Sequence, residues 1–149
     1  MTNIQITAQN LVDELRLAFP EIEDRYQNER NSWGNEPPGN YNIFGFVFKP
    51  LLREELAKCE SEEFMRRLCS FMERVCASSD VEAINVIWLK IFKLLLHAPE
   101  TVKLLWPLLG PNTRLNIEDA AARWGMICNL PVLARVRAAR FLITPHREG

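Results

Sequence analysis

The segment from Val81 to Leu96 limits the possible folds most, because it is apolar around most of a helical circumference. On a helical wheel, Glu82, Lys90, Lys93 and the following His97 form one narrow polar wedge, and Asn85 lies off to one side of it. A helix of this composition must be covered by other elements on several sides. We therefore expect it at the centre of the fold, with Trp88 in the core. The charged residues within it argue against a membrane span.

Helical spacing of apolar residues continues over most of the chain. From Phe44 to Leu52 the apolar positions fall at offsets of 3, 4, 7 and 8 residues, which predicts a helix that is kinked near Pro50. Ser61 is expected to cap the next helix, which runs to Ala77. Further helices are expected before Pro20 and over residues 21–30, 99–109, 111–124 and 131–140.

These elements predict an all-α fold of about seven helices in antiparallel hairpins. Ser79 and Glu82 have the spacing of a capping box, which would start the central helix. The helices over 61–77 and 79–97 have the lengths of one helical-repeat unit, so we expect a short solenoid-like stack. The length of 149 residues indicates a single domain over residues 1–149.

The charges balance over the whole chain, with 18 lysines and arginines against 19 aspartates and glutamates. A net charge of −1 provides no general attraction to nucleic acid or to an anionic membrane. The two ends differ, since residues 1–36 carry a net charge of −4 and residues 120–149 a net charge of +4. The ends either face each other or are simply solvated; the alternative is that each presents a patch to a partner.

The basic C-terminal segment keeps a nucleic-acid role open as the alternative hypothesis. Three of its arginines spread around the predicted helix instead of forming one stripe, and one follows the helix: Arg135, Arg137, Arg140 and Arg147. We expect the packing face between them to consist of Val132, Val136, Ala139 and Ile143. A nucleic-acid role is therefore the less favoured hypothesis.

Cysteine and histidine usage predicts neither a metal site nor a cofactor. The four cysteines form no C-x-x-C pair: Cys59, Cys69, Cys76 and Cys128. Cys69 and Cys76 lie two turns apart on one predicted helix, which is too far for a disulfide. We expect reduced, half-buried thiols; the alternative is a redox pair of Cys59 with Cys128. The histidines, His97 and His146, are too few for most metal sites. Residues 1–15 carry no secretory signal, so we expect a cytoplasmic protein.

No catalytic motif is present. The chain has no glycine-rich phosphate loop and no G-x-S-x-G elbow. Adjacent acidic residues point apart on a helix, so they do not converge on a substrate. The segment from Gly110 to Arg114 enters a helix, where free N–H groups could hold an anion beside Arg114; the alternative is that Asn112 and Thr113 only fill the first helical turn. We expect no enzyme.

The segment from Asn31 to Asn42 is the longest irregular stretch that we expect, with two prolines and two glycines. Trp33 and Tyr41 lie in it, and such side chains are good anchors for a protein partner. Equally often, such side chains pack against the body of the protein and hold the loop there as a lid. The predicted partner-binding residues are Trp33, Glu36, Tyr41, Asn112 and Arg114.

Several short strings occur in a fixed order: F-P-E at 19–21, S-W-G at 32–34, P-P-G-N-Y-N-I-F-G-F-V-F-K-P-L-L at 37–52, L-W-P-L-L-G-P-N-T-R at 105–114 and R-W-G at 123–125. With these strings the chain resembles an uncharacterised bacterial family of small all-helical, immunity-type proteins. The resemblance ends at residue 125. It implies a helical fold, a bacterial cytosolic setting and a protein-binding role, and it supplies no catalytic residues.

Together these features predict a non-enzymatic protein-binding module. Its most concrete form is an immunity protein that neutralises a cognate bacterial toxin by covering the toxin's active site. The expected surface is the Trp33–Tyr41 loop with Arg114 and the acidic first helices. The alternative is a nucleic-acid-associated or regulatory helical protein that uses the basic segment 126–149. The sequence leaves the oligomeric state open, because the apolar stripes can pack within one monomer or form the interface between two copies.

Overall fold

The computed structural model describes residues 4–58 and 61–143, and every regular element in these ranges is helical. The all-α prediction is confirmed, whereas the stacking of hairpins as a short solenoid stays a prediction. In chain order the elements are α1 (Leu11–Ala18), the 3₁₀ turn η1 (Pro20–Ile22), α2 (Glu23–Ser32), α3 (Asn40–Ile43), the π-helical turn η2 (Phe44–Phe48), α4 (Lys49–Lys58), α5 (Glu62–Cys76), α6 (Val81–Ile87), the π-helical turn η3 (Trp88–Phe92), α7 (Lys93–Leu96), α8 (Pro99–Leu105), the 3₁₀ turn η4 (Trp106–Leu108), α9 (Pro111–Arg123), the 3₁₀ turn η5 (Ile127–Asn129), α10 (Val132–Ala138) and α11 (Arg140–Ile143).

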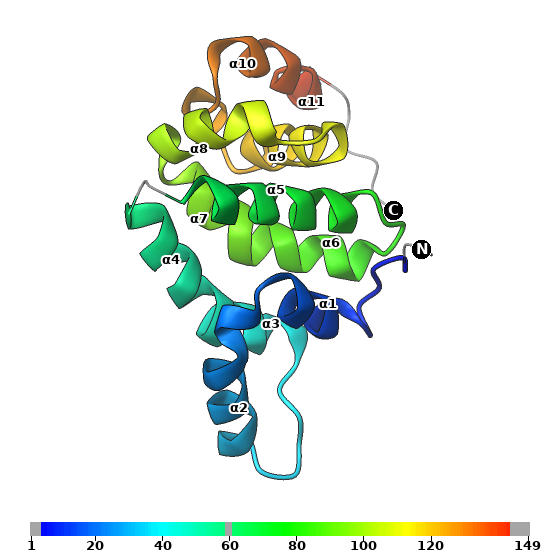
Figure 1. Ribbon diagram of the computed structural model, residues 1–149. Coiled ribbons are helices and arrows are strands. Elements are labelled where there is room, and N and C mark those ends of the chain that lie inside the picture. The colour runs from blue at the N-terminus through cyan, green and yellow to red at the C-terminus, as the bar shows by residue number, and fades with distance from the viewer. Residues whose placement is uncertain (1–3, 59–60, 144–149) are drawn as a thin grey trace.

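The expected central helix is formed by α6, η3 and α7 without interruption (Figure 1). It packs against α5 and α9, and its buried side chains are Ala83, Val86, Ile87, Ile91, Phe92, Leu95 and Leu96. Trp88 is only half-buried, so the expectation of a core position for it is wrong, and the neighbouring Leu89 is exposed. The π-helical turn explains this, because a wider turn shifts the following side chains away from the 3.6-residue period.

A kink is expected near Pro50, and the structure has a π-helical turn just before this residue. α3, η2 and α4 form one helix over residues 40–58, and the N–H of Lys49 donates to the carbonyl of Phe44 in the π-helical pattern. Pro50 has no N–H to donate to the preceding turn, so a wider turn at this point is physically reasonable. The helix begins at Asn40, so the irregular loop covers residues 33–39 and is shorter than expected.

An aromatic cluster joins the N-terminal helices to α5. The Phe19 ring lies 4.8 Å from Phe48, 5.3 Å from Phe64 and 5.9 Å from Phe71, between ring centroids. All four side chains are buried. Tilted and edge-on pairs at these distances add to the burial of apolar area. The cluster therefore fixes α1, η2 and α5 against one another.

Two predicted helix ends are confirmed and one is wrong. Ser61 caps α5, since its hydroxyl oxygen accepts from the N–H of Phe64 at 3.3 Å. Gly125 ends α9 in the left-handed region with φ of 68°. The Ser79–Glu82 box does not form, because Asp80 is the N-cap and accepts from the N–H of Ala83 at 3.1 Å. Its second carboxylate oxygen accepts from the N–H of Ala8 at 2.9 Å, which a serine in this place could not also do.

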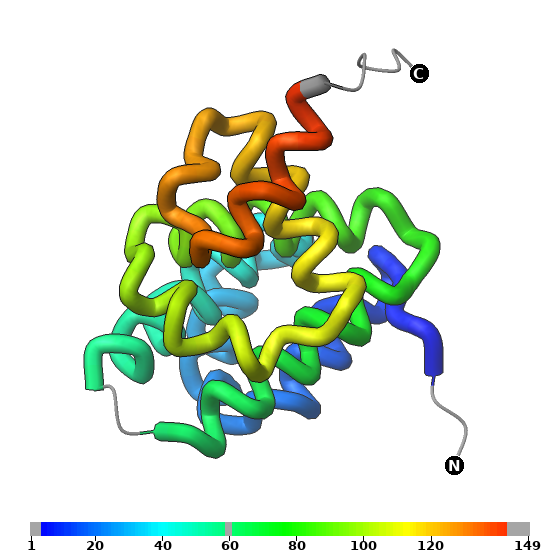
Figure 2. Tube along the Cα trace, turned by 90° about the horizontal axis from the view of Figure 1, so that it is seen from above, coloured from blue at the N-terminus to red at the C-terminus, as the bar shows by residue number. Residues whose placement is uncertain are grey.

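The C-terminal helices lie over the second half of the molecule. α10 and α11, orange and red in Figure 2, pack against α9. In Figure 1 they form the end of the molecule opposite to α2 and the loop that follows it. Within the described ranges, no helix is both long and apolar enough to cross a membrane.

Candidate protein-binding surface

The predicted anion site at the start of α9 is filled by a carboxylate of the chain itself. Glu73, on α5, accepts at Oε2 from the N–H of Asn112 at 3.2 Å and from its side-chain amide at 2.8 Å. At Oε1 it accepts from the N–H and the hydroxyl of Thr113, both at 2.8 Å. A Cβ on Gly110 would lie 2.4 Å from Cδ of Glu73, so glycine permits this approach.

Burial raises the pKa of the Glu73 carboxyl, but these hydrogen bonds together outweigh burial and hold the pKa below its ordinary value. The site is therefore an internal cap on α9 and is not open to a ligand. Asn112 faces Glu73, and we remove it from the candidate surface.

Arg114 is also used within the chain. Its Nη2 donates to the carbonyl of Trp106 at 2.8 Å, and its guanidinium lies 5.7 Å from the centre of the Trp106 ring. These contacts hold the connection between α8 and α9. The strings that include residues 110–114 thus have a structural explanation, and Arg114 is removed from the candidate surface.

Trp33, Glu36 and Tyr41 are exposed, as expected for partner contacts. The indole N–H of Trp33 donates to Oε1 of Glu29 at 2.9 Å, which orients the ring. No side chain of α2 is fully buried, and the helix and its loop extend from the lower end of the molecule in Figure 1. The loop does not cover the body as a lid. It lies far from α9, so the five predicted residues do not form one surface.

Two members of the expected packing face of α10, Val132 and Val136, are exposed instead, and so is Leu133. Val132, Leu133 and Val136 are 69%, 76% and 73% exposed, whereas Ala134 and Ala138 are fully buried. α10 packs against α9, in which the alanines at residues 120–122 are buried as well. The larger apolar side chains are left on the outside. Ala139 is half-buried, and the side chain of Ile143 lies outside the described residues.

The arginines of α10 mostly hold the helix in place. Nε of Arg137 donates to Oε2 of the buried Glu118 at 3.2 Å, and Nε of Arg135 donates to the carbonyl of Leu130 at 2.8 Å. The guanidinium of Arg140 lies 4.8 Å from the centre of the Phe141 ring. Arg147 lies outside the described residues. The basic groups that suggested nucleic acid are thus largely engaged within the chain.

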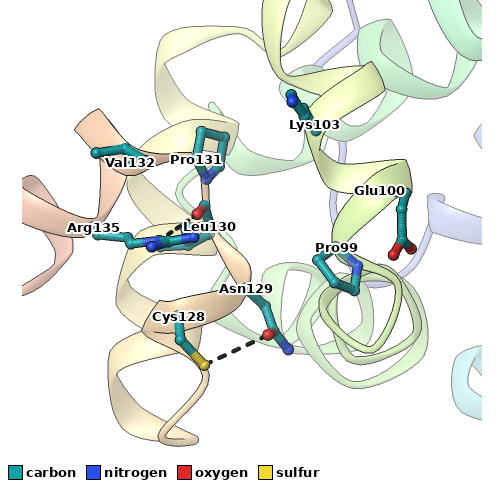
Figure 3. Close-up of a pocket in the computed structure, with 9 residues that line it drawn as sticks. All are labelled: Pro99, Glu100, Lys103, Cys128, Asn129, Leu130, Pro131, Val132 and Arg135. Carbon is teal, nitrogen blue, oxygen red and sulfur yellow. Dashed lines mark hydrogen bonds between the residues drawn. The ribbon is translucent and has the colours of Figure 1, made fainter.

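A cavity of about 320 Å³ adjoins the exposed apolar face, between α8 and the start of α10 (Figure 3). Its lining is Pro99, Glu100, Lys103, Cys128, Asn129, Leu130, Pro131, Val132 and Arg135. Val132 belongs both to the cavity and to the exposed face, so the two are continuous. We call Val132, Leu133 and Val136 together with this cavity the α10 surface.

Sequence reasoning missed the α10 surface because two stripes compete on this helix. Val132 and Val136 are spaced four residues apart, and so are Ala134 and Ala138. Because valine is more hydrophobic than alanine, the sequence predicts that the valine stripe packs against the protein, and this prediction is wrong. The useful signal is that α9, against which α10 packs, is also rich in buried alanines.

The cysteines show no catalytic arrangement in the described part of the chain. Cys69 and Cys76 are free and buried, and burial raises their pKa values to about 11 and about 12. Cys128 is free and exposed. Cys59 and His146 lie outside the described residues, so the suggested Cys59–Cys128 pair does too. Within residues 4–58 and 61–143, no three His, Cys, Asp or Glu side chains are grouped so that they could hold a metal ion.

A family model described as a domain of unknown function (DUF7674) matches residues 12–125. The match ends at Gly125, the residue that terminates α9, so the α10 surface lies largely beyond it. No curated protein and no solved structure matches the chain.

Proposed function

This chain belongs to the DUF7674 family, and we propose that it is a non-enzymatic protein-binding module whose partner docks on the α10 surface. The observation that carries the proposal is the exposure of Val132, Leu133 and Val136, each about 70% accessible on one short helix. Contiguous apolar patches on a protein surface mark sites of interaction. A partner that covers them gains the free energy of burying apolar area.

The adjoining cavity favours a protein as the partner. Interfaces commonly have an apolar centre that receives an anchoring side chain, with a polar rim around it. Here Leu130, Pro131 and Val132 supply apolar lining, and Arg135 and Glu100 supply polar groups. We expect a helix or loop of the partner to cover α10 and to insert one apolar side chain into the cavity.

The narrower proposal is that the chain is an immunity protein that covers the active site of a cognate bacterial toxin. The resemblance in its sequence supports this role, and occlusion needs only a preformed surface. The projecting loop with Trp33 and Glu36, together with Tyr41 at the start of α3, is then a second contact, at the opposite end of the molecule from α10.

Substitution of the apolar face tests the binding proposal. We would purify the tagged chain from its bacterial host after nuclease treatment and quantify the bound proteins by mass spectrometry. The double variant Leu133→Glu with Val136→Glu should lose a stoichiometric partner. The control is Leu17→Glu on α1, since Leu17 is 76% exposed, like Leu133. Equal retention by both variants would exclude the α10 surface.

Two further outcomes are informative. Loss of all bound protein on nuclease treatment would favour the alternative of a nucleic-acid-associated protein. If the partner is toxic when expressed alone, co-expression of the wild-type chain should restore growth and the α10 variant should not. Toxicity that is unchanged by the wild-type chain would exclude the immunity role, and Trp33→Ala tests the contribution of the loop in the same assay.

A further inference from the structure

Most lysines and arginines of the described residues donate to a carboxylate or a carbonyl of the chain. Those with no such partner in residues 4–58 and 61–143 are Arg30, Lys49, Arg53, Lys90, Lys93 and Lys103. Four of them belong to two helices that pass each other at their π-helical turns. We call Lys49, Arg53, Lys90 and Lys93 the basic cluster.

The two helices meet at Gly45. Nζ of Lys90 lies 3.4 Å from the position that a Cβ on Gly45 would take, so the lysine side chain crosses directly over this glycine. Gly45, Lys49 and Arg53 follow one another at four-residue spacing on one helix, so they lie on neighbouring turns. Lys93 lies one turn beyond Lys90 on the other helix. The four cations therefore gather along one seam between the helices.

The electrostatics agree with this geometry. Lys49 is half-buried, and burial is the main cause that lowers the pKa of its ammonium, followed by the positive charges of Arg53, Lys90 and Lys93. Like charges held together destabilise a fold unless a counter-charge compensates them. No carboxylate of the described residues pairs with these four side chains. A bound anionic group would remove this repulsion.

An exposed aromatic side chain borders the cluster. Phe46 is 64% exposed and directly follows Gly45, the residue that Nζ of Lys90 approaches. An aromatic ring beside several cations suits a ligand that combines negative charge with an apolar group.

We propose that the basic cluster and Phe46 dock an acidic segment of a partner protein, whose carboxylates meet the four cations while one apolar side chain covers Phe46. This inference rests on the proposed protein-binding function and adds the chemistry of the partner. Charge complementarity favours a compact acidic segment, because the four cations are confined to one seam between two helices. The net charge of −1 also gives no long-range attraction to nucleic acid.

Fluorescence anisotropy with a labelled oligoglutamate peptide that carries a central phenylalanine tests the proposal. The intact wild-type chain should bind the peptide at low salt. The variant Lys90→Gln with Lys93→Gln should bind about tenfold more weakly, as expected for the loss of two exposed ion pairs. Arg30→Gln with Arg66→Gln is the matched control, because it removes two exposed cations that belong neither to the cluster nor to the α10 surface, and it should bind like wild type. Phe46→Ala should also weaken binding.

Several results would overturn the proposal. No peptide binding at low salt, or an equal loss in the cluster and control variants, excludes a specific acidic-segment site. Tighter binding of a labelled oligo-dT through the same lysines would assign the cluster to nucleic acid. Peptide binding should survive in Leu133→Glu with Val136→Glu. The two tests are therefore independent. If the α10 surface retains no partner, peptide binding to the basic cluster can still be observed. If the basic cluster binds no peptide, the α10 surface can still retain a partner.

Discussion

The carboxylate of Glu73 on α5 accepts from both the N–H and the hydroxyl of Thr113 on α9, each at 2.8 Å. Thr113 is fully buried, so neither of its donors can turn to water instead. The contact joins two residues that are 40 positions apart and satisfies N–H groups that an α-helix leaves free at its start. It fixes α9, and the helices that pack on it, to the hairpin of α5 and α6.

Glu73→Ala should therefore lower the free energy of unfolding by about 2–3 kcal/mol, because it leaves the buried donors of Thr113 without a partner. Urea denaturation followed by circular dichroism measures this. The control is Glu62→Ala, since Glu62 is exposed and pairs with Arg66 on the same helix, and it should cost less than about 0.5 kcal/mol. Equal effects of the two substitutions would contradict the capping role.

The stabilisation by Glu73 should depend on pH. The pKa of this carboxyl is lower in the folded chain than its ordinary value of 4.5, so folding favours the ionised form. The stabilisation is complete above pH 4.5 and is lost as the pH falls through the lower, folded-state pKa. The difference in unfolding free energy between wild type and Glu73→Gln should thus be largest at neutral pH and shrink below pH 4.5. A difference that stays constant to pH 3 would contradict this linkage.

The unfolding free energy of the variant must be subtracted from that of wild type at each pH, because other carboxylates also become protonated in acid. The pKa values of Glu21, Glu23 and Asp80 are lowered too, mainly by hydrogen bonds from Arg67, from Arg16 and from the N–H of Ala8 respectively. These groups destabilise both proteins alike on acidification. Only the difference between the two proteins isolates Glu73.

Gly110→Ala should act through Glu73. The new methyl carbon would lie 2.4 Å from Cδ of Glu73, so the carboxylate must leave its place at Asn112 and Thr113. We expect a loss of about 1–3 kcal/mol in unfolding free energy, similar to that of Glu73→Ala. In a Glu73→Ala background the same change should be neutral or stabilise by up to about 1 kcal/mol, because alanine restricts the unfolded chain. A double-mutant cycle with additive effects would contradict this coupling.

Features that depend on a few neighbouring residues could be predicted from the sequence. The cap at Ser61 and the end of α9 at Gly125 follow from local backbone chemistry. The buried side of α5 follows from helical period alone: the apolar residues that share one face of the helix, Phe64, Leu68, Phe71, Met72 and Val75, are all buried. The central position of residues 81–96 follows from their apolar circumference.

Features that depend on distant partners could not be predicted. The sequence around Asn112 and Arg114 suggested an open anion site, because nothing near them indicates that Glu73 fills it. The choice between the valine and alanine stripes of α10 depends on the surface of α9. The π-helical turns move Leu89 outward and bring Lys90 over Gly45, and no period of 3.6 residues predicts either.

Thiol reactivity gives a direct test of the core assignment. Cys128 is exposed, whereas Cys69 and Cys76 are buried on α5. A rise in pKa from 9.0 to about 11 leaves roughly 100-fold less Cys69 thiolate at a given pH, and burial also blocks the reagent. In a Cys59→Ser variant, an aromatic disulfide reagent should therefore modify Cys128 rapidly and the other two thiols only after unfolding in urea. Cys128→Ser on the same background should abolish the fast phase. A fast phase that persists in this second variant would place Cys69 or Cys76 at the surface and contradict the packing of α5.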